Sequence, residues 1–521
     1  MRTLVFFSST VAWFGLAGVL LGSAGDGNAA LRAEPPAILT VEANRPSHQM
    51  AGGIGASWHA IRVKQRFDEA VRYRYDVRHD NPQGSAVGAN PPLDSAAWED
   101  IDRLGRWLGL DWLRVELSRR MYEPQKGRFD WDNEEMRTLY RILDWCQRND
   151  ADVFLTEMWR NVDWLAYPEV HPLLSAPNSL EDFAEGLAAL ADHLIRQKQY
   201  TCIKWLCIAN EPPGGTWGYW WSRGQENAPL APAFEVVRET LNRRGIALPL
   251  SGPDWTDMPK LEPVRLDFAP YLGAFDIHSY GAPNADTSRI LGDWTRWAHQ
   301  QGRPFFLTEL GDMSLGWGTD NPGPSSFEAV LSNAEKILRG LNVGVDGFNR
   351  WSFLNRGDLD GQWQLVRTWD REAGRFLARA EPEPVPFYGY AMLTRFTAKH
   401  SCLLPCEWQF KTNNTDPPRV FAAALRSPRG RLTLILANRE TAALETHFRW
   451  QGLDGETMFH RYEVTEDKVK DPAFKLASEG QFTLSPRQSD FNYTLPPRSL
   501  VVFSAYDLTP DAPGVTADHS P

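Results

Sequence analysis

The chain has 521 residues, of which 42% are hydrophobic, and its formal net charge is -11 at pH 7. This length is sufficient for a catalytic barrel of roughly 250 residues together with a smaller module. The negative charge argues against nucleic acid and against a membrane surface as binding partners, since both require a concentrated basic patch.

The 22 tryptophan residues are a high number for a chain of this length. Their flat apolar rings with a polar N–H suit stacking on sugars, although many of them can simply fill the core. The five cysteines are few for an exported protein and odd in number, so disulfides are not expected to be its main support. Cys402 and Cys406 are close enough in sequence for a local bridge.

Residues 1–30 have the three parts of a secretory signal peptide. Arg2 makes the start basic, residues 4–21 are largely apolar, and small residues follow up to Ala30. The alternative interpretation is an uncleaved membrane anchor. Hydroxyl side chains and glycines within the apolar run make it poorly suited to that role. We therefore expect a secreted or periplasmic protein that has no membrane contact after cleavage.

Short apolar strands then alternate with helical patterns, as in a parallel α/β barrel whose strands are covered on both faces. The predicted barrel strands lie at 52–59, 112–117, 153–157, 205–209, 248–253, 275–280, 304–309 and 347–353. In such barrels the catalytic groups are mounted at the carboxyl ends of the strands, where the following loops can shape a cleft.

The first two strands end on polar and aromatic residues. Trp58 and His59 are candidate sugar contacts, with a packed core pair as the alternative. Strand alternation puts Arg114 and Glu116 on one face of the second strand. One interpretation is that they form an ion pair inside the barrel that has no catalytic role.

The third and fourth strands each end on a glutamate. Glu157, with Trp159 just beyond it, is expected to make substrate or supporting contacts. The fourth strand runs into Asn210-Glu211-Pro212, and it must stop there because proline has no N–H for the ladder. Asn210 and Glu211 are therefore expected at the carboxyl edge of the sheet.

A glycine-rich aromatic loop with Trp217 follows and resembles a sugar platform, and Trp255, which ends the fifth strand, is a further candidate substrate contact, as is Trp159 after the third. The sixth strand puts His278 and Tyr280 on one face. The seventh strand ends on Glu309, so two strand ends now present one glutamate each. Paired carboxylates on a common rim suit glycoside hydrolysis, in which one protonates the leaving oxygen and the other attacks carbon or activates water.

Trp351 lies in the eighth strand and Trp363 in the turn beyond it, and both are candidate substrate contacts. The acidic turn at 358–363 lacks the remaining ligands of a calcium loop. None of the 11 histidines forms a His-x-His or His-Glu-x-x-His pair, so no metal or other cofactor is expected.

Asn210-Glu211-Pro212 together with Glu309 resembles the catalytic signature of the clan A glycoside hydrolases, which are retaining enzymes with a (β/α)8 TIM barrel. The resemblance implies that Glu211 is the acid/base and Glu309 the nucleophile. It also implies that Arg114 supports the nucleophile and that Asn210 contacts the sugar 2-hydroxyl.

The resemblance extends to the sixth and eighth strands. It implies that the Tyr280 hydroxyl bonds the nucleophile, that His278 steadies the network, and that Trp351 floors the sugar subsite. Matches at five ordered strand ends are much less expected by chance than one three-residue motif. The motifs are shared by the clan and do not select among families such as 5, 30 and 39.

The composition changes at the proline-rich stretch 381–386, which we interpret as a linker before a closing helix at 389–396. Short strands up to Tyr506 then predict an all-β sandwich, which either braces the barrel or binds carbohydrate. A strand from the amino terminus is expected to join it, as in families 30 and 39. The expected divisions are a signal peptide, a strand segment, the catalytic barrel, the sandwich and a disordered tail, at 1–30, 31–47, 48–384, 385–508 and 509–521.

The sequence thus predicts a secreted retaining glycosidase that cleaves β-linked oligo- or polysaccharides. A transglycosylase on the same scaffold and a non-hydrolytic carbohydrate-binding protein are the alternatives, and the presence of both glutamates weighs against the second. A retaining mechanism requires carboxyl groups about 5 to 5.5 Å apart, against roughly 6.5 to 9.5 Å for inversion.

Overall fold

The computed structural model describes residues 37–61, 90–212, 220–223, 226–256, 267–316, 322–354, 363–370, 372–410 and 417–508. The expected signal peptide, the expected disordered tail and Trp217 lie outside the described residues. Within them, no helix has the length and apolar character needed to cross a membrane.

Eight parallel strands form a closed barrel in the order β10-β11-β12-β3-β4-β5-β6-β9. Their bounds are β3 (Ile54–His59), β4 (Trp112–Ser118), β5 (Asp152–Trp159), β6 (Ile203–Cys207), β9 (Leu250–Trp255), β10 (Ala274–Ser279), β11 (Phe305–Leu310) and β12 (Gly347–Arg350). The predicted (β/α)8 TIM barrel is therefore confirmed.

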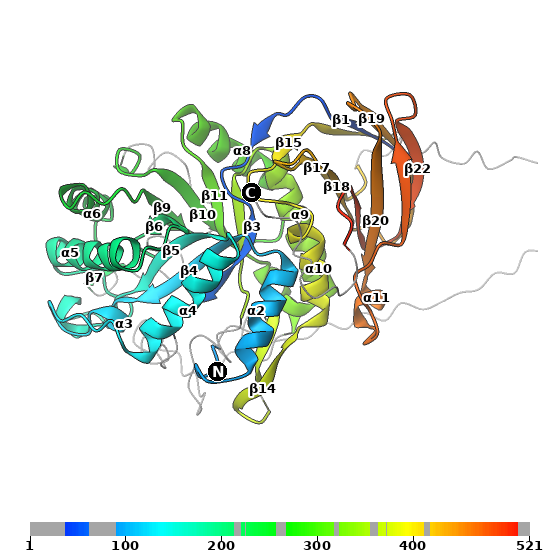
Figure 1. Cartoon of the computed structure of the whole chain (residues 1–521). Helices are drawn as coiled ribbons and strands as arrows, with labels where there is room; N and C mark the ends of the chain where they lie inside the picture. Colours follow the sequence, from blue (N-terminus) through cyan, green and yellow to red (C-terminus); the bar gives the residue numbers. More distant parts are fainter. Residues whose placement is uncertain are drawn as a thin grey trace, which may run out of the picture. The chain divides into compact units, whose positions relative to one another are not determined.

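Helices cover the outside of this barrel (Figure 1). They are α2 (Ala97–Leu108), α3 (Arg119–Tyr122), α4 (Glu134–Arg148), α5 (Leu180–Ala191), α6 (Ala231–Arg243), α8 (Ala285–Gln300), α9 (Phe327–Asn342) and α10 (Pro384–Thr394). Side-chain caps fix several of their starts, because an oxygen there accepts an otherwise unpaired N–H. Ser179, for example, accepts from the amide of Asp182, and Asn133 accepts from that of Met136.

The barrel interior has an apolar layer beneath a polar one. The apolar layer is a cluster of buried side chains from five strands, namely Trp112, Phe154, Cys207, Ala274 and Phe306. Because side chains alternate along a strand, residues two and four positions further on point into the barrel as well. On β4, the residues two and four positions after Trp112 are Arg114 and Glu116. These polar side chains therefore fill the barrel interior towards its carboxyl end.

The stretch 381–386 is not a linker. It comprises the end of a hairpin, β13 (Val366–Asp370) with β14 (Arg375–Pro382), and the first turn of α10. Proline is accepted in a first helical turn because the N–H that it lacks would be unpaired there. Helix α10 docks on the barrel through the Tyr390 hydroxyl, which donates to the carbonyl of Gly55 at 2.6 Å. The helix thus completes the barrel, and the sandwich begins after it.

The sandwich consists of two sheets, ordered β16-β1-β19-β22 and β2-β15-β17-β18-β23-β20-β21. In the first sheet β1 lies between β16, to which it is antiparallel, and β19, to which it is parallel. The bounds are β1 (Ala37–Glu42), β2 (His48–Gln49), β15 (Cys402–Leu404), β16 (Cys406–Gln409), β17 (Val420–Arg426), β18 (Leu432–Asn438), β19 (Leu444–Gln451), β20 (Thr457–Thr465), β21 (Gly480–Leu484), β22 (Asp490–Leu495) and β23 (Ser499–Ser504).

Cys402 and Cys406 belong to different sheets, and all five cysteines are free thiols. Shorter elements include β7 (Trp221–Arg223), β8 (Glu226–Asn227), α11 (Glu466–Lys470) and four short helical segments, η1 (Asp163–Leu165), η2 (Asp192–Gln197), η3 (Met313–Leu315) and η4 (Gly323–Ser325).

Asp346, just before β12, joins the amino end of the barrel to the strand that leads in from the sandwich. One of its oxygens accepts from His48 Nε2 at 2.7 Å and from the amide of Ala51 at 3.0 Å. The other accepts from His299 Nε2 at 2.8 Å and from the amide of Phe305 at 3.0 Å. Burial alone would raise the pKa of Asp346, but the hydrogen bonds from the two histidines hold it below its usual value.

We expect Asp346→Asn to lower the free energy of unfolding by roughly 2 to 4 kcal/mol at pH 7, because an amide cannot accept all four hydrogen bonds. A depressed pKa in the folded state means that the carboxylate stabilises the protein above its ordinary pKa of about 4 and loses this effect as the pH falls. Denaturant unfolding between pH 8 and pH 3 should therefore show the two proteins converging at low pH.

The matched control for this measurement is Asp454→Asn. Asp454 is exposed and pairs only with Arg426, at 3.1 Å, so its loss should change stability by less than about 0.5 kcal/mol. A difference between Asp346→Asn and the wild type that stayed constant over the whole pH range would contradict the proposed role of the carboxylate.

Candidate active site

Glu211 follows β6 and is held in an unusual backbone conformation. Its φ is 44°, in the left-handed region that side-chain-bearing residues rarely occupy, and its amide donates to the carbonyl of Asp254 at 3.0 Å. Strain of this kind costs of order 1 kcal/mol or more and tends to cluster at functional sites. The backbone therefore fixes the direction in which this carboxylate points.

Glu309 lies near the end of β11, where a bulge redirects the strand. Ile277 pairs with Leu307, but the next pair is His278 with Glu309, so Thr308 is an extra residue. The Glu309 carboxylate accepts from Arg114 Nη1 at 2.5 Å and from the Tyr280 hydroxyl at 2.6 Å.

Arg114 is fully buried and connects four groups. Besides Glu309, its guanidinium donates to Glu116 at 2.5 Å, to the amide oxygen of Asn210 at 2.8 Å and to Asp254 at 2.8 Å. Burial nevertheless outweighs this cation at Glu116, whose pKa is raised to about 7, whereas Arg114 and His278 lower the pKa of Asp254. The expected contact between Arg114 and Glu309 is present, and so is the ion pair between Arg114 and Glu116.

His278 lies between Glu211 and Asp254, with Nδ1 2.9 Å from Glu211 and Nε2 2.9 Å from Asp254. Burial would lower the pKa of His278, but the charges of Asp254 and Glu309 raise it well above its usual value. Both ring nitrogens face a carboxylate oxygen, which is the arrangement that suits an imidazolium donating from both.

The pKa of Glu211 is raised above its usual value, first by burial and further by the charges of Glu309 and Asp254, while the bond from His278 opposes the rise. A carboxyl group with a raised pKa keeps its proton closer to neutral pH, as a general acid requires. Because one oxygen accepts from His278, the other is the one left to carry a proton towards a leaving group.

The two glutamates lie close together. One oxygen of Glu211, one of Glu309 and a ring nitrogen of His278 all lie within 4.8 Å of one another. The nearest oxygens of the two carboxylates are therefore no more than 4.8 Å apart, which is below the roughly 6.5 to 9.5 Å that separates the carboxyl groups of inverting enzymes. The same three groups have the spacing of metal ligands, but the hydrogen bonds among them already account for the arrangement.

Asp254 is an essential part of this cluster that the sequence analysis did not select. It accepts hydrogen bonds from both Arg114 and His278. Burial would raise the pKa of Asp254, but these two partners outweigh that effect and lower it. Its position at the end of the fifth strand was the available signal. Asp276 lies beneath it, accepts from the Asp254 amide at 2.7 Å, and has a pKa raised by burial to about 8.

Some of the expected substrate contacts lie beside the two glutamates. His59 pairs with Glu116 at 3.1 Å, and its ring contacts those of Trp351 and Trp159. Trp363 packs edge-on against Tyr280, with ring centroids 5.9 Å apart. Trp159 follows a bulge in β5, which turns it towards His59.

Other candidates face away from the barrel interior. Trp58 is on the outward face of β3, where it packs against Trp98, Trp145 and Phe353, so the core alternative is the correct one for this residue. Trp255 packs against Phe268, with ring centroids 5.6 Å apart.

Glu157 is also in a different environment from the one expected. Phe154 points into the barrel, so alternation turns Glu157 outward, where it accepts from Arg119 Nε at 3.0 Å and from the Tyr122 hydroxyl. Both of its oxygens are bonded within this buried cluster. Glu157 therefore stabilises the fold and does not face the space where a substrate would bind.

Lys336 of α9 is a further polar residue that the sequence did not indicate. Its ammonium is fully buried and donates to the carbonyls of Ser279, Gly281 and Gly311 at 2.7, 2.9 and 2.6 Å. The carbonyls of Ser279 and Gly281 lie on either side of Tyr280, which directly follows β10. The carbonyl of Gly311 lies two residues after Glu309, directly after β11. Lys336 therefore fixes the ends of the two strands that carry the tyrosine and the glutamate.

The comparisons with known proteins concern the family and the fold. Residues 87–335 match the family model "Cellulase (glycosyl hydrolase family 5)". Solved structures share the whole arrangement at low sequence identity. The family 30 endoxylanase of Clostridium papyrosolvens is 13% identical, with a TM-score of 0.58 over 90% of this chain and 99% of that one. No curated protein matches the chain.

The barrel is that of a clan A glycoside hydrolase.

Two further structures are similar to this glycoside hydrolase. A conserved exported protein from Bacteroides fragilis is 13% identical, with a TM-score of 0.60 over 90% of this chain and 100% of that one. The endo-beta1,6-glucanase BT3312 is 14% identical, with a TM-score of 0.55 over 91% and 95% of the two chains. The predicted clan is therefore confirmed, and the chain is an O-glycosyl hydrolase.

We expect Asp254→Asn to lower the kcat/KM of this glycoside hydrolase on the order of 10²-fold, since it disturbs both the cation and the imidazole that surround the glutamates. Without Asp254, His278 loses the largest of the charges that raise its pKa, so its pKa falls and the ring gives up its proton at a lower pH than in the wild type. The pKa of Glu211 then rises, because the loss of an adjacent cation outweighs the loss of a more distant anion. The alkaline limb of the pH–rate profile should move to higher pH, and a shift to lower pH would contradict the assignment.

Replacing Lys336 by methionine should lower kcat by roughly 10- to 100-fold with a smaller effect on KM, because it releases the strand ends that position Glu309 and Tyr280. Leu338→Ala, a fully buried residue of the same helix, is the matched control for lost stability. If both variants lost Tm and kcat to the same extent, Lys336 would contribute only to stability.

Proposed function

We propose that this protein is a retaining glycosidase that hydrolyses β-linked oligo- or polysaccharides by double displacement. The single observation that carries the proposal is that Glu211 and Glu309, at the ends of two barrel strands, have carboxylate oxygens within 4.8 Å of each other. An upper limit below the inverting range supports direct attack by one carboxylate over attack by a water molecule held between the two.

In the proposed mechanism Glu309 is the nucleophile. Arg114 and Tyr280 donate hydrogen bonds to its two oxygens, at 2.5 and 2.6 Å, and so orient the carboxylate for attack. It attacks the anomeric carbon and forms a covalent glycosyl-enzyme. As its charge is consumed, the buried Tyr280 hydroxyl, whose pKa is well above its usual value, stays protonated and continues to position the bonded oxygen.

Glu211 is the acid/base in the same proposal. It protonates the departing oxygen in the first step and then takes a proton from the water that releases the sugar. The cationic His278 donates to one Glu211 oxygen at 2.9 Å throughout, so proton transfer uses the other oxygen. The raised pKa of Glu211 supports the first step, and the anion left after it is stabilised by His278 for the second.

We also propose that the chain is exported. The basic, apolar and small-residue segments of residues 1–30 support a cleaved signal, and one similar structure is that of a conserved exported protein. The substrate is then a polysaccharide or oligosaccharide outside the cytoplasm. Because similar structures include a xylanase and an endo-beta1,6-glucanase, xylan and β-1,6-glucan are the first substrates to test.

The test compares the wild type with Glu309→Ala and Glu211→Ala on xylan, β-glucans, galactans and activated aryl glycosides. We expect Glu309→Ala to lose activity by a factor on the order of 10⁴ or more, and azide to restore part of it with formation of an inverted glycosyl azide. Glu211→Ala should keep more activity on aryl glycosides, whose leaving groups need little protonation, and azide should there give a product with retained configuration.

Glu157→Gln is the control, because it alters a glutamate of the same barrel that lies outside the cluster. Its folded fraction should keep the wild-type kcat. Full activity in Glu309→Ala would refute the proposed nucleophile, and products longer than the substrate would indicate a transglycosylase.

A further inference from the structure

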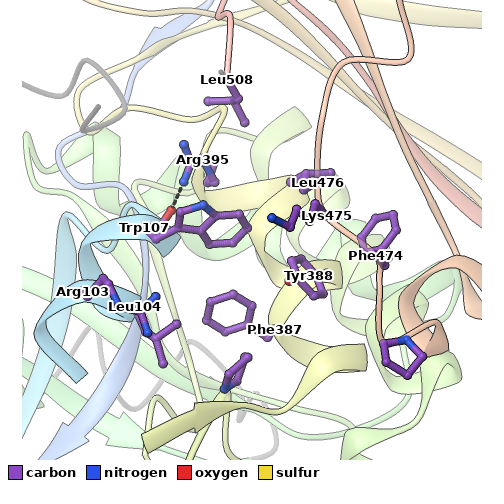
Figure 2. A pocket seen from close by; sticks show the side chains of 12 residues that line it. Arg103, Leu104, Trp107, Phe387, Tyr388, Arg395, Phe474, Lys475, Leu476 and Leu508 are labelled. Carbon is purple, nitrogen blue, oxygen red and sulfur yellow. Dashed lines mark hydrogen bonds between the residues drawn. The ribbon is translucent and has the colours of Figure 1, made fainter. Parts of the chain in front are cut away.

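A pocket of about 240 Å³ lies beside the carboxyl end of α2, against α10 and the segment that follows α11 (Figure 2). Helix α2 leads into the amino end of β4, whereas the two glutamates lie at the carboxyl ends of their strands. None of the residues lining the pocket belongs to the active site described above. Pockets for drug-sized ligands start at about 300 Å³, so this one suits a single ring.

The walls of the pocket are aromatic. Trp107 of α2 and Phe387 of α10 stack at a centroid distance of 5.1 Å, and Tyr388 meets Phe474 edge-on at 5.0 Å. Figure 2 shows these side chains around the opening. Such rings provide flat apolar surfaces for the face of a ligand.

Arg395, directly after α10, supplies a charge that is not balanced. The side chain is 4% exposed, lies 4.5 Å from the Trp107 ring and donates one hydrogen bond, from Nη1 to the Trp107 carbonyl. Its Nε has no hydrogen-bond partner, and no carboxylate among the described residues pairs with it. A buried guanidinium without a counterion is costly, and an anion bound beside it would offset that cost.

The remaining charges of the pocket have the same sign. Arg103 and Lys475 also line it, and its lining contains no aspartate or glutamate within the part of the chain that the structure describes. Arg103 forms an ion pair, at 3.3 Å, with Asp100, which does not line the pocket. Lys475 likewise has a partner of its own, so Arg395 is the lining cation on which the charge of the pocket depends. The pocket is therefore complementary to an anion.

We propose that this pocket binds a carboxylate carried on a six-membered ring, with the carboxylate on Arg395 and the ring against Trp107, Tyr388 and Phe474. A hexuronate unit of an acidic polysaccharide and a free aromatic acid share this chemistry. In the first case the pocket gives the hydrolase a second point of attachment to its polymer. In the second it is a site for a small effector.

The test is calorimetric titration of the full-length protein at low salt with glucuronate, galacturonate and benzoate, each against a neutral counterpart, glucose, galactose or benzyl alcohol. At least one acid should bind ten or more times more tightly than its neutral counterpart. Tighter binding of the sugar acids or of benzoate distinguishes the two sources. Equal affinity of every acid and its neutral counterpart would overturn the proposal.

Variants locate the binding. Arg395→Gln should weaken it at least tenfold and Lys475→Glu about fivefold, while the hydrolysis of neutral polysaccharide stays within twofold of the wild type. Lys470→Gln is the control, since that exposed lysine of α11 pairs with Glu466 and lies outside the pocket. Unchanged affinity in Arg395→Gln, or in Lys475→Glu if the first variant fails to fold, would equally overturn the proposal.

Discussion

The carboxyl end of the barrel depends on one buried guanidinium. Arg114 is fully enclosed, and its two terminal nitrogens bond oxygens of Glu116, Glu309, Asn210 and Asp254. The partners come from four different strands or strand ends, so a single side chain connects elements far apart in sequence. Without this cation the buried carboxylates of Glu116, Glu309 and Asp254 would lose the group that they share, and His278 would be the remaining positive partner that the structure places beside Asp254.

The cluster gives two glutamates, which are chemically identical in isolation, different surroundings. Glu309 receives a cation and a hydroxyl donor, whereas Glu211 receives an imidazolium that is itself shared with Asp254. Differences of this kind push apart the protonation behaviour of two nearby carboxyl groups, which is what a division between nucleophile and acid requires. Asp254 contributes to both environments and thereby couples them.

Helix α9 connects this cluster to the rest of the protein. On one side Lys336 donates to carbonyls at the ends of β10 and β11. On the other, Asn342 donates to the carbonyl of Ala422 in β17 at 2.7 Å, and Glu335 accepts from Arg439 at 2.5 Å. Helix α9 is therefore hydrogen-bonded both to the sandwich and to the ends of the barrel strands beside Tyr280 and Glu309.

The sequence by itself determined where the barrel strands end and which residues stand there. Pro212 stops a strand directly after Asn210 and Glu211, and alternation puts His278 and Tyr280 on one face, because both effects act within a few residues. What only the tertiary structure decided depends on contacts between distant segments. These are the bulge at Thr308 that redirects Glu309, the outward turn of Glu157, the α10 start within a proline-rich stretch, and the positions of Asp254 and Lys336. No local pattern specifies such features, because their partners lie on other strands and become neighbours only when the barrel closes.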